Sequence, residues 1–296
     1  MILTSKMAKR IGFAGAAMLL ALSAAEAKTT MIDGFGTTPE SCAFGPDGSI
    51  YLSVTNKYDT YGDGYVGKVV DGKIVPVATG LNDPHGIDVW NNEIYIADNR
   101  GQVWKATMDG VVTKLADSGM FPRKITNLND IEVDPANGDV YVSDSGDWEG
   151  GDGAIFRISK DGAITLVLSD DDNTRLVSPN GLKLDGKGGL LIYDWTTAVL
   201  SRLNLADKTL TRINGNLGQG DGIAFGPDGT VYLGAYFAGI KGRAEAGAAS
   251  DGTFISLEKL GAKSVADIAI SDDGKTLCAP DFDGAKLFVL PLDEAR

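Results

Sequence analysis

The chain has 296 residues and a mass of 31.0 kDa; 43% of its residues are hydrophobic and 23% are charged, a composition that can bury a large core and excludes a disordered or collagen-like protein. It contains 2 Cys and 1 His, too few for a disulfide-built miniprotein, a cluster zinc site or an iron–sulfur centre, so any metal must be held mainly by oxygen. The formal net charge of −13 opposes binding to a phosphate backbone, and we expect no nucleic-acid partner.

Residues 1–27 have the features of a secretory signal peptide. A basic segment over residues 6–10 precedes an apolar stretch over residues 11–25, and residues 25–27 (Ala-Glu-Ala) match a cleavage site. The apolar stretch is shorter than the roughly 20 residues that a membrane-spanning helix needs, which argues against a retained anchor. We therefore expect an exported product, periplasmic or secreted, that has no membrane association once the signal is removed.

A short pattern recurs six times after this leader. Each copy has a variable lead residue, an alternating apolar pair two and four positions later, a turn rich in Gly, Asp or Asn, and a second apolar run. Period-two alternation on both sides of such a turn is typical of a β-hairpin. The lead residues, spaced 41 to 51 positions apart, are Glu40, His85, Asn129, Asn180, Asp221 and Ala266. This spacing is the length of a four-stranded propeller blade.

Further strand-like runs complete each unit, such as residues 67–70 and 74–78 in the first. The sequence thus predicts an all-β fold: a six-bladed β-propeller with four antiparallel strands per blade, forming one domain over residues 28–296. The last unit ends before a fourth strand, which we expect residues 28–35 to supply. A pair of β-sandwiches would not account for six matched spacings.

The lead residues should form a ring at one mouth of the channel, because equivalent positions in every blade face the same axis. Glu40 and Asp221 supply carboxylates, and Asn129 and Asn180 supply carboxamides. Any one of them alone would more often be a turn former. Together they offer the hard oxygen ligands that suit Ca²⁺, and a cation would relieve the repulsion between the two carboxylates. The sequence therefore predicts a Ca²⁺ site formed by these four residues, with Mg²⁺, which keeps more of its water, as the alternative ion.

The two cysteines lie near opposite ends of the mature chain. If the compartment is oxidising, Cys42 and Cys278 could join the first blade to the last. The sequence does not fix the distance between them, so their pairing stays open.

The order of these motifs resembles a known superfamily of calcium-dependent six-bladed hydrolases, which includes the SMP-30/gluconolactonase proteins, the diisopropylfluorophosphatases and the paraoxonases. The resemblance covers essentially the whole mature chain and rests on Glu40, followed by Asn129 in NLNDIEVD, Asn180 in SPNGLKLD and Asp221 in GDGIAFGPDG. It implies that these four residues hold one catalytic calcium.

The second blade begins Asp83-Pro84-His85-Gly86, similar to a Pro-His-Gly segment of the paraoxonases. Those enzymes use a second His, which this chain lacks, so a simple His dyad is excluded. Their structural calcium uses an acidic residue after the Glu, where this chain has Ser41, and a second structural ion is therefore in doubt. Gly222 follows Asp221, as in the gluconolactonases, and the subfamily stays open.

We expect an exported calcium-dependent hydrolase acting on a small molecule, a lactone or an activated ester and secondarily a phosphotriester. Asp221, as base or nucleophile, and His85, as base or proton shuttle, are the candidate catalytic residues. Aromatic residues of the loops at the same mouth are expected to form a substrate wall: Tyr58, Tyr61, Trp148, Trp195, Tyr236 and Phe237. Two alternatives remain, a non-enzymatic propeller that binds a ligand or protein partner, and a lyase or isomerase on the same scaffold. The oligomeric state is not predicted.

Overall fold

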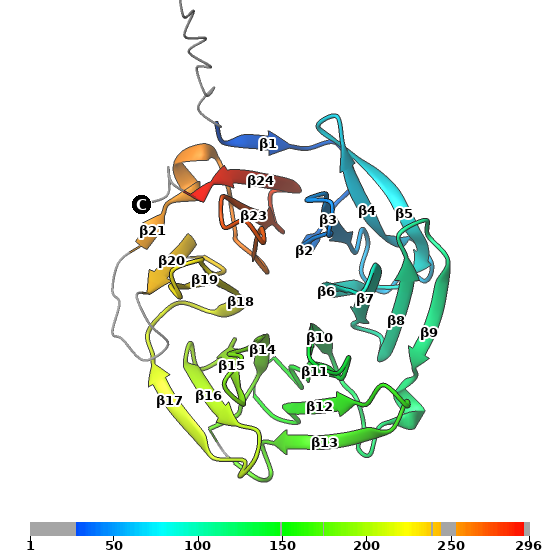
Figure 1. Cartoon of the computed structure of the whole chain (residues 1–296), viewed down its shortest axis with the longest axis vertical. Helices are drawn as coiled ribbons and strands as arrows, with labels where there is room; N and C mark the ends of the chain where they lie inside the picture. The colour runs from blue at the N-terminus through cyan, green and yellow to red at the C-terminus, as the bar shows by residue number, and fades with distance from the viewer. Residues whose placement is uncertain (1–27, 149, 174, 238, 244–252, 293–296) are drawn as a thin grey trace, which may run out of the picture.

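The computed structural model of the chain describes residues 28–148, 150–173, 175–237, 239–243 and 253–292. The predicted signal peptide lies outside these residues. The described part forms six four-stranded antiparallel sheets arranged as blades around a central channel (Figure 1). The predicted all-β six-bladed propeller is therefore confirmed.

The first three blades follow the chain without a crossover. Their strands are β2 (Pro39–Phe44), β3 (Ile50–Val54), β4 (Gly64–Val70) and β5 (Lys73–Leu81), then β6 (Pro84–Trp90), β7 (Glu93–Asp98), β8 (Gln102–Thr107) and β9 (Val112–Ala116), then β10 (Leu128–Val133), β11 (Val140–Asp144), β12 (Ala154–Ile158) and β13 (Ile164–Ser169). A short 3-10 helix, η1 (Ser118–Met120), connects the second blade to the third.

The last three blades repeat this order, with one exception at the end of the ring. Their strands are β14 (Pro179–Leu184), β15 (Gly189–Asp194), β16 (Leu200–Asn204) and β17 (Leu210–Asn214), then β18 (Gly220–Phe225), β19 (Val231–Ala235), β20 (Gly239–Arg243) and β21 (Thr253–Ile255), then β22 (Ala269–Ile270), β23 (Thr276–Asp281) and β24 (Lys286–Pro291), with η2 (Leu257–Leu260) before β22. The N-terminal strand β1 (Thr30–Ile32) pairs with β24, so the first strand completes the last blade as predicted.

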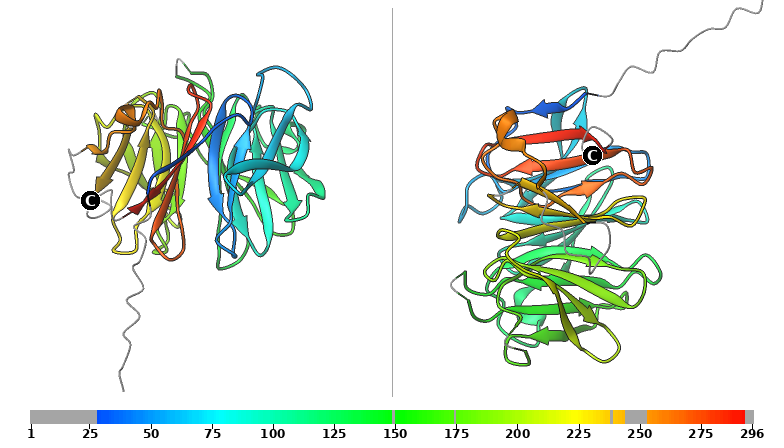
Figure 2. Two further views of the ribbon diagram at one scale, coloured as in Figure 1. Left: turned by 90° about the horizontal axis from the view of Figure 1, so that it is seen from above. Right: turned by 90° about the vertical axis from the view of Figure 1, so that its left-hand side faces the viewer.

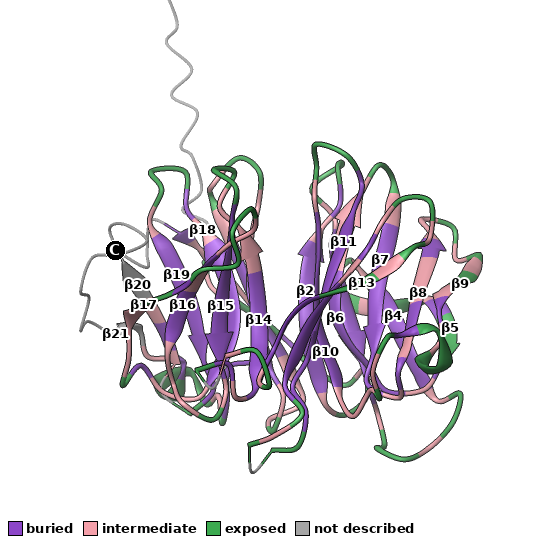
Figure 3. Cartoon of the chain, turned by 90° about the horizontal axis from the view of Figure 1, so that it is seen from below, coloured by how far each residue is buried: buried purple, intermediate pink, exposed green. Residues whose placement is uncertain are grey.

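The hydrophobic core is divided into six layers, one between each pair of neighbouring blades. Tyr51 and Val66 of the first blade, for example, pack against Ile94 and Ile96 of the second. Side views show the strands crossing the thickness of the disc (Figure 2), and burial is concentrated along them while the loops at both faces are exposed (Figure 3). Because each layer needs both of its blades, the core is complete only when the ring is closed.

A register shift that recurs in the repeat sets the orientation of the lead residues. In five blades the pairing of the innermost strand with the second strand shifts register at the lead residue, as between Pro39 and Cys42 in β2. Such a bulge re-aims side chains and is common beside functional sites. In the first and third blades a serine opposite the bulge, Ser53 or Ser143, accepts a hydrogen bond from the backbone N–H that follows the lead residue.

The recurring aspartates at the ends of the second strands have a structural role. Asp98, Asp144, Asp194 and Asp281 each accept backbone N–H groups from the loop that enters their own blade. They thereby fix the loops that carry the first residues of the innermost strands. Among the described residues there is no helix long and apolar enough to cross a membrane.

Candidate functional site

The structure brings the predicted ligands together in one cavity at one mouth of the channel. This cavity has a volume of about 570 Å³, and Glu40, His85, Asn129, Asn180 and Asp221 all line it. These five side chains come from five different blades, and each residue is no more than 4% exposed. The sixth lead residue, Ala266, is buried and adds no polar group. The repeat has therefore converted one structural position into a converging set of polar side chains.

Three of the four candidate ligands hold a buried oxygen with no hydrogen-bond partner among the described residues: Glu40 Oε2, Asn129 Oδ1 and Asp221 Oδ1. Asn129 donates from Nδ2 to Ser145 Oγ at 3.1 Å, which fixes the orientation of the amide beside His85. A buried acceptor without a partner costs free energy, and such groups are rare in folded proteins. Three of them on one cavity wall fit an oxygen-binding cation.

The electrostatics of the channel also favour a cation. Burial raises the pKa of Glu40 well above its ordinary value, and the neighbouring Asp221 and Asp267 raise it further. Burial raises the pKa of Asp221 in the same way, with Asp267 and Asp130 adding to the effect. A positive charge placed among these carboxyl groups would stabilise their ionised forms.

The carboxylates alone do not make a metal site. Within the described part of the chain, no three His, Cys, Asp or Glu side chains are grouped closely enough to hold a metal ion. A cation at this mouth would therefore depend on the carboxamides of Asn129 and Asn180 as well as on Glu40 and Asp221. Such an all-oxygen set with two negative charges suits Ca²⁺ better than zinc or copper.

His85 lies beside these residues in a neutral form. Its Nε2 is 2.7 Å from Tyr58 Oη, and its Nδ1 lies 4.0 Å from Glu40 Oε1. Burial lowers the pKa of His85 to about 4. The imidazole is therefore uncharged at neutral pH, and Tyr58 holds its orientation.

Aromatic rings form a nearly continuous arc around the cavity, which we call the aromatic arc. Neighbouring ring centroids are 4.9–6.1 Å apart along the series Trp148, Trp195, Tyr236, Phe282 and Tyr58. These rings come in order from the third, fourth, fifth, sixth and first blades. The second blade contributes no Phe, Tyr or Trp ring to the arc, but the imidazole of its His85 lies 5.7 Å from the ring of Tyr58.

Five of the six predicted wall residues line the cavity: Tyr58, Tyr61, Trp148, Trp195 and Tyr236. Phe237 does not; it is 70% exposed and contacts the ring of Tyr236. Phe282 was missed in the sequence because it sits in a DFDG turn, yet it directly follows the second strand, as do Trp195 and Tyr236. Its position directly after the second strand of the blade is the signal by which Phe282 could have been identified in the sequence.

The opposite end of the channel has a smaller cavity of about 230 Å³, lined in part by Asp88, Asp130, Glu132 and Lys183. Both carboxylate oxygens of Asp130 accept backbone N–H groups, and Lys183 Nζ lies 2.6 Å from Glu132 Oε2. The protein thus supplies its own positive charge here, and we propose no second ion.

No family model matches the chain, and no curated protein matches it. Among solved structures, a candidate gluconolactonase matches with a TM-score of 0.68 and 19% identity, covering 90% of this chain and 92% of its own. A gluconolactonase from Xanthomonas campestris matches with a TM-score of 0.68 and 15% identity, covering 89% of each chain. A chain of a nidogen/laminin complex matches with a TM-score of 0.65 and 20% identity, covering 79% and 85%.

These likenesses define the class of the molecule: it is a six-bladed β-propeller with the fold found in gluconolactonase structures. Two of the three structures thus agree with the superfamily that the sequence motifs resemble. At 15–20% identity the likeness extends to the fold. The function has to be argued from the site.

Proposed function

We propose that the protein is a calcium-dependent hydrolase of lactones or activated esters, with phosphotriesters as a second substrate class. The observation that carries this proposal is the set of three unpartnered buried oxygens, on Glu40, Asn129 and Asp221, that face one cavity. A purely structural channel would be expected to supply hydrogen-bond donors to such buried acceptors.

In this proposal Glu40, Asn129, Asn180 and Asp221 hold one Ca²⁺. When bound, the cation supplies polarisation of the substrate carbonyl and stabilises the negative charge that develops on its oxygen. Asp221, whose Oδ1 has no partner in the described structure, either takes a proton from an attacking water or attacks the carbonyl itself.

Two further elements of the site would support this chemistry. His85, oriented by Tyr58 Oη, is placed beside Glu40 and would act as the proton shuttle. The aromatic arc would hold the apolar part of the substrate and limit the access of water from the sides of the cavity. The cavity lies within the size range of small-molecule sites, so a small molecule is the proposed partner.

The site also bears on the alternative of a binding module. The propeller of the nidogen/laminin complex is part of an assembly of proteins, so the fold alone is compatible with that role. A concave cavity with unpartnered carboxylates and a neutral His favours chemistry on a small molecule instead. A lyase or isomerase would use the same groups, and only its reaction products would distinguish it from the proposed hydrolase.

We also propose that the protein works outside the cytoplasm. The disulfide between Cys42 and Cys278 fits an oxidising compartment, such as the periplasm or the medium, and agrees with the signal expected in residues 1–27.

The test is turnover of a panel of sugar and acyl lactones by purified protein, with free calcium controlled. We expect hydrolysis that EDTA abolishes and added Ca²⁺ restores. No turnover with or without calcium would favour the binding module, and a product other than the open hydroxy acid would favour a lyase or isomerase.

A further inference from the structure

The cavity has a polar sector where the aromatic arc is open. Around the second blade its lining is mainly polar and includes Asp83, Asn99, Arg100 and Gln102. The loop entering the third blade adds Thr126, together with the apolar Ile125. The cavity is therefore divided into an aromatic side and a hydrogen-bonding side. The candidate ligands and His85 lie in the same cavity.

Asp83 is the most unusual residue of this sector. It is 1% exposed, its Oδ2 is 2.6 Å from Arg100 Nε, and its Oδ1 has no hydrogen-bond partner among the described residues. Its backbone is fixed on both sides, because its N–H donates to Asp98 Oδ1 and its carbonyl accepts the N–H of Asn99. The carboxylate cannot easily turn away to find a partner.

Arg100 keeps the Asp83 carboxylate in place. The guanidinium also contacts Asp59, and it lies 5.5 Å from the ring centroid of Tyr61. Thr126 Oγ1 is a second buried oxygen of the same lining without a partner in the described structure. A carboxylate that is already paired through one oxygen can use the other only to accept, so the missing partner of Asp83 is a donor.

We propose that Asp83 determines specificity by accepting a hydrogen bond from a hydroxyl group of the substrate. The substrate class is then an amphipathic lactone or ester, with an apolar substituent against the aromatic arc and a hydroxyl group directed at Asp83 Oδ1. This inference rests on the proposed function, which identifies the bond that is hydrolysed. The inference itself concerns only how the substrate is bound. It also disfavours a carboxylate or phosphate group at this end of the cavity.

The kinetic test uses δ-decalactone and its three ring-monohydroxylated derivatives. We expect at least one hydroxylated lactone to have a kcat/KM ten- to a hundredfold above that of the parent, mainly through a lower KM, because a hydrogen bond to a buried charged acceptor is a strong one. In Asp83→Asn the advantage should fall below threefold, since the hydroxyl group then meets a neutral amide in place of a charged acceptor. Asp71→Asn, at an exposed turn of the first blade outside this cavity, should keep the advantage.

A second measurement does not depend on turnover. The corresponding δ-lactams resist hydrolysis, and their binding can be followed by the fluorescence of Trp148 and Trp195, which line the cavity. Tighter binding of a hydroxylated lactam by the wild type, lost in Asp83→Asn, would support the inference even if no lactone were hydrolysed.

Equal affinity of the wild type for all four lactams would overturn the inference, even if lactones were hydrolysed normally. Retention of the preference by a folded Asp83→Asn protein would also overturn it. Should Asp83→Asn fail to fold, the affinities of the wild type for the four lactams still decide. Thr126→Val then serves as the second variant, because it removes the other unpartnered oxygen of the same lining.

Discussion

Asn129 uses one side of its amide in the structure and leaves the other side open, as the proposed calcium site requires. Its Nδ2 donates to Ser145 Oγ, whose own hydroxyl donates to the carbonyl of Pro179 in the next blade. Its Oδ1 has no partner among the described residues. The hydrogen bonds on one side of the amide thus leave the other side poised for a cation.

Replacing Asn129 with Ala should weaken calcium binding at least tenfold, because one of four ligand oxygens is lost together with its anchored geometry. Isothermal titration with Ca²⁺ measures this directly, with circular dichroism to verify the fold. Asn137→Ala, in a hairpin turn of the same blade, is the matched control. Unchanged calcium affinity in Asn129→Ala would remove Asn129 from the proposed ligand set.

Lys183 stabilises two buried carboxyl groups at the far end of the channel. Burial raises the pKa of Glu132 to about 7, and it also raises the pKa of Asp88, with Lys183 opposing both shifts. The folded protein therefore holds a proton on Glu132 at pH values where the unfolded chain has released it. Stability from this group is fully present below the ordinary pKa near 4.5 and is lost as the pH rises through about 7.

Lys183→Met should consequently destabilise the protein by about 2 kcal/mol at pH 8, because it leaves ionised carboxylates without a counter-charge. At pH 5 the loss should be much smaller, since the carboxyl groups can protonate. Urea unfolding of the wild type and the variant at both pH values measures the difference, and Lys187→Met in an exposed turn serves as control. An equal loss at both pH values would contradict the assigned role of Glu132.

The convergence of the candidate site residues could be predicted from the sequence because the repeat made their positions comparable. Glu40, Asn129, Asn180 and Asp221 occupy one position of a template, and the structure places all four in one cavity. Asp83 was not recognised as a site residue, because nothing in a single sequence distinguishes a carboxylate with one free oxygen from an ordinary turn residue. Its state depends on Arg100 and on burial, which only the assembled ring determines.

At the scale of the strand, close contact between neighbouring blades explains why glycine follows the lead residue in the P-N-G and P-H-G motifs. In P-N-G, a Cβ on Gly181 would overlap the carbonyl oxygen of Asp221 in the neighbouring blade. In P-H-G, a Cβ on Gly86 would lie 2.6 Å from the Asp130 Cα. The innermost strands approach each other so closely at these points that no side chain fits. The sequence showed the glycines, but not the neighbouring strand that requires them.

Gly181→Ala should push β14 away from β18 and separate Asn180 from Asp221. We expect a loss of about 2–3 kcal/mol in unfolding free energy, the magnitude of an overpacked core, and a calcium affinity reduced roughly tenfold. Urea unfolding and calcium titration measure the two effects. Gly119→Ala, where a Cβ would meet open space, is the control. A variant with normal stability and normal calcium binding would show that the strands can separate without cost.

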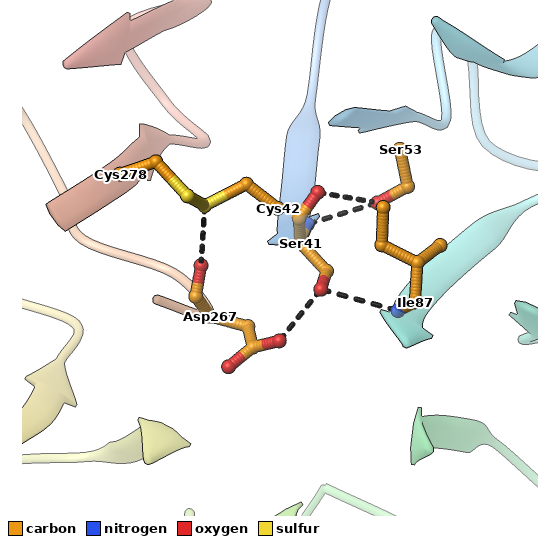
Figure 4. Close-up of a disulfide and its surroundings, with 6 residues drawn as sticks. All are labelled: Ser41, Cys42, Ser53, Ile87, Asp267 and Cys278. Atoms are coloured by element: carbon orange, nitrogen blue, oxygen red, sulfur yellow. Dashed lines mark hydrogen bonds between the residues drawn. A yellow bond between two sulfur atoms is a disulfide. The ribbon is translucent and has the colours of Figure 1, made fainter. Parts of the chain in front are cut away.

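At the scale of the whole molecule, two devices close the ring between the first and last blades. Strand β1 pairs with β24, and a disulfide joins Cys42 of β2 to Cys278 of β23, both buried (Figure 4). The disulfide lies beside Ser41 and Asp267, whose side chains hydrogen-bond to each other at 2.6 Å between the same two blades. The sequence predicted the strand closure from a missing fourth strand, whereas the pairing of the cysteines required the distance across the ring.

Replacing both cysteines with Ala should lower the unfolding free energy by about 2–5 kcal/mol, because the bond closes a loop with a sequence separation of 236 residues. Calcium affinity should stay near that of the wild type, since the pairing of β1 with β24 still holds the last blade against the first. Urea unfolding with and without dithiothreitol measures the effect, and the reductant should leave the double variant unchanged. If the oxidised and reduced wild type unfolded at the same urea concentration, the strand closure alone would be sufficient to keep the ring together. If the double variant instead lost its calcium affinity, the disulfide would be needed to position Glu40, which lies only two residues before Cys42 in β2.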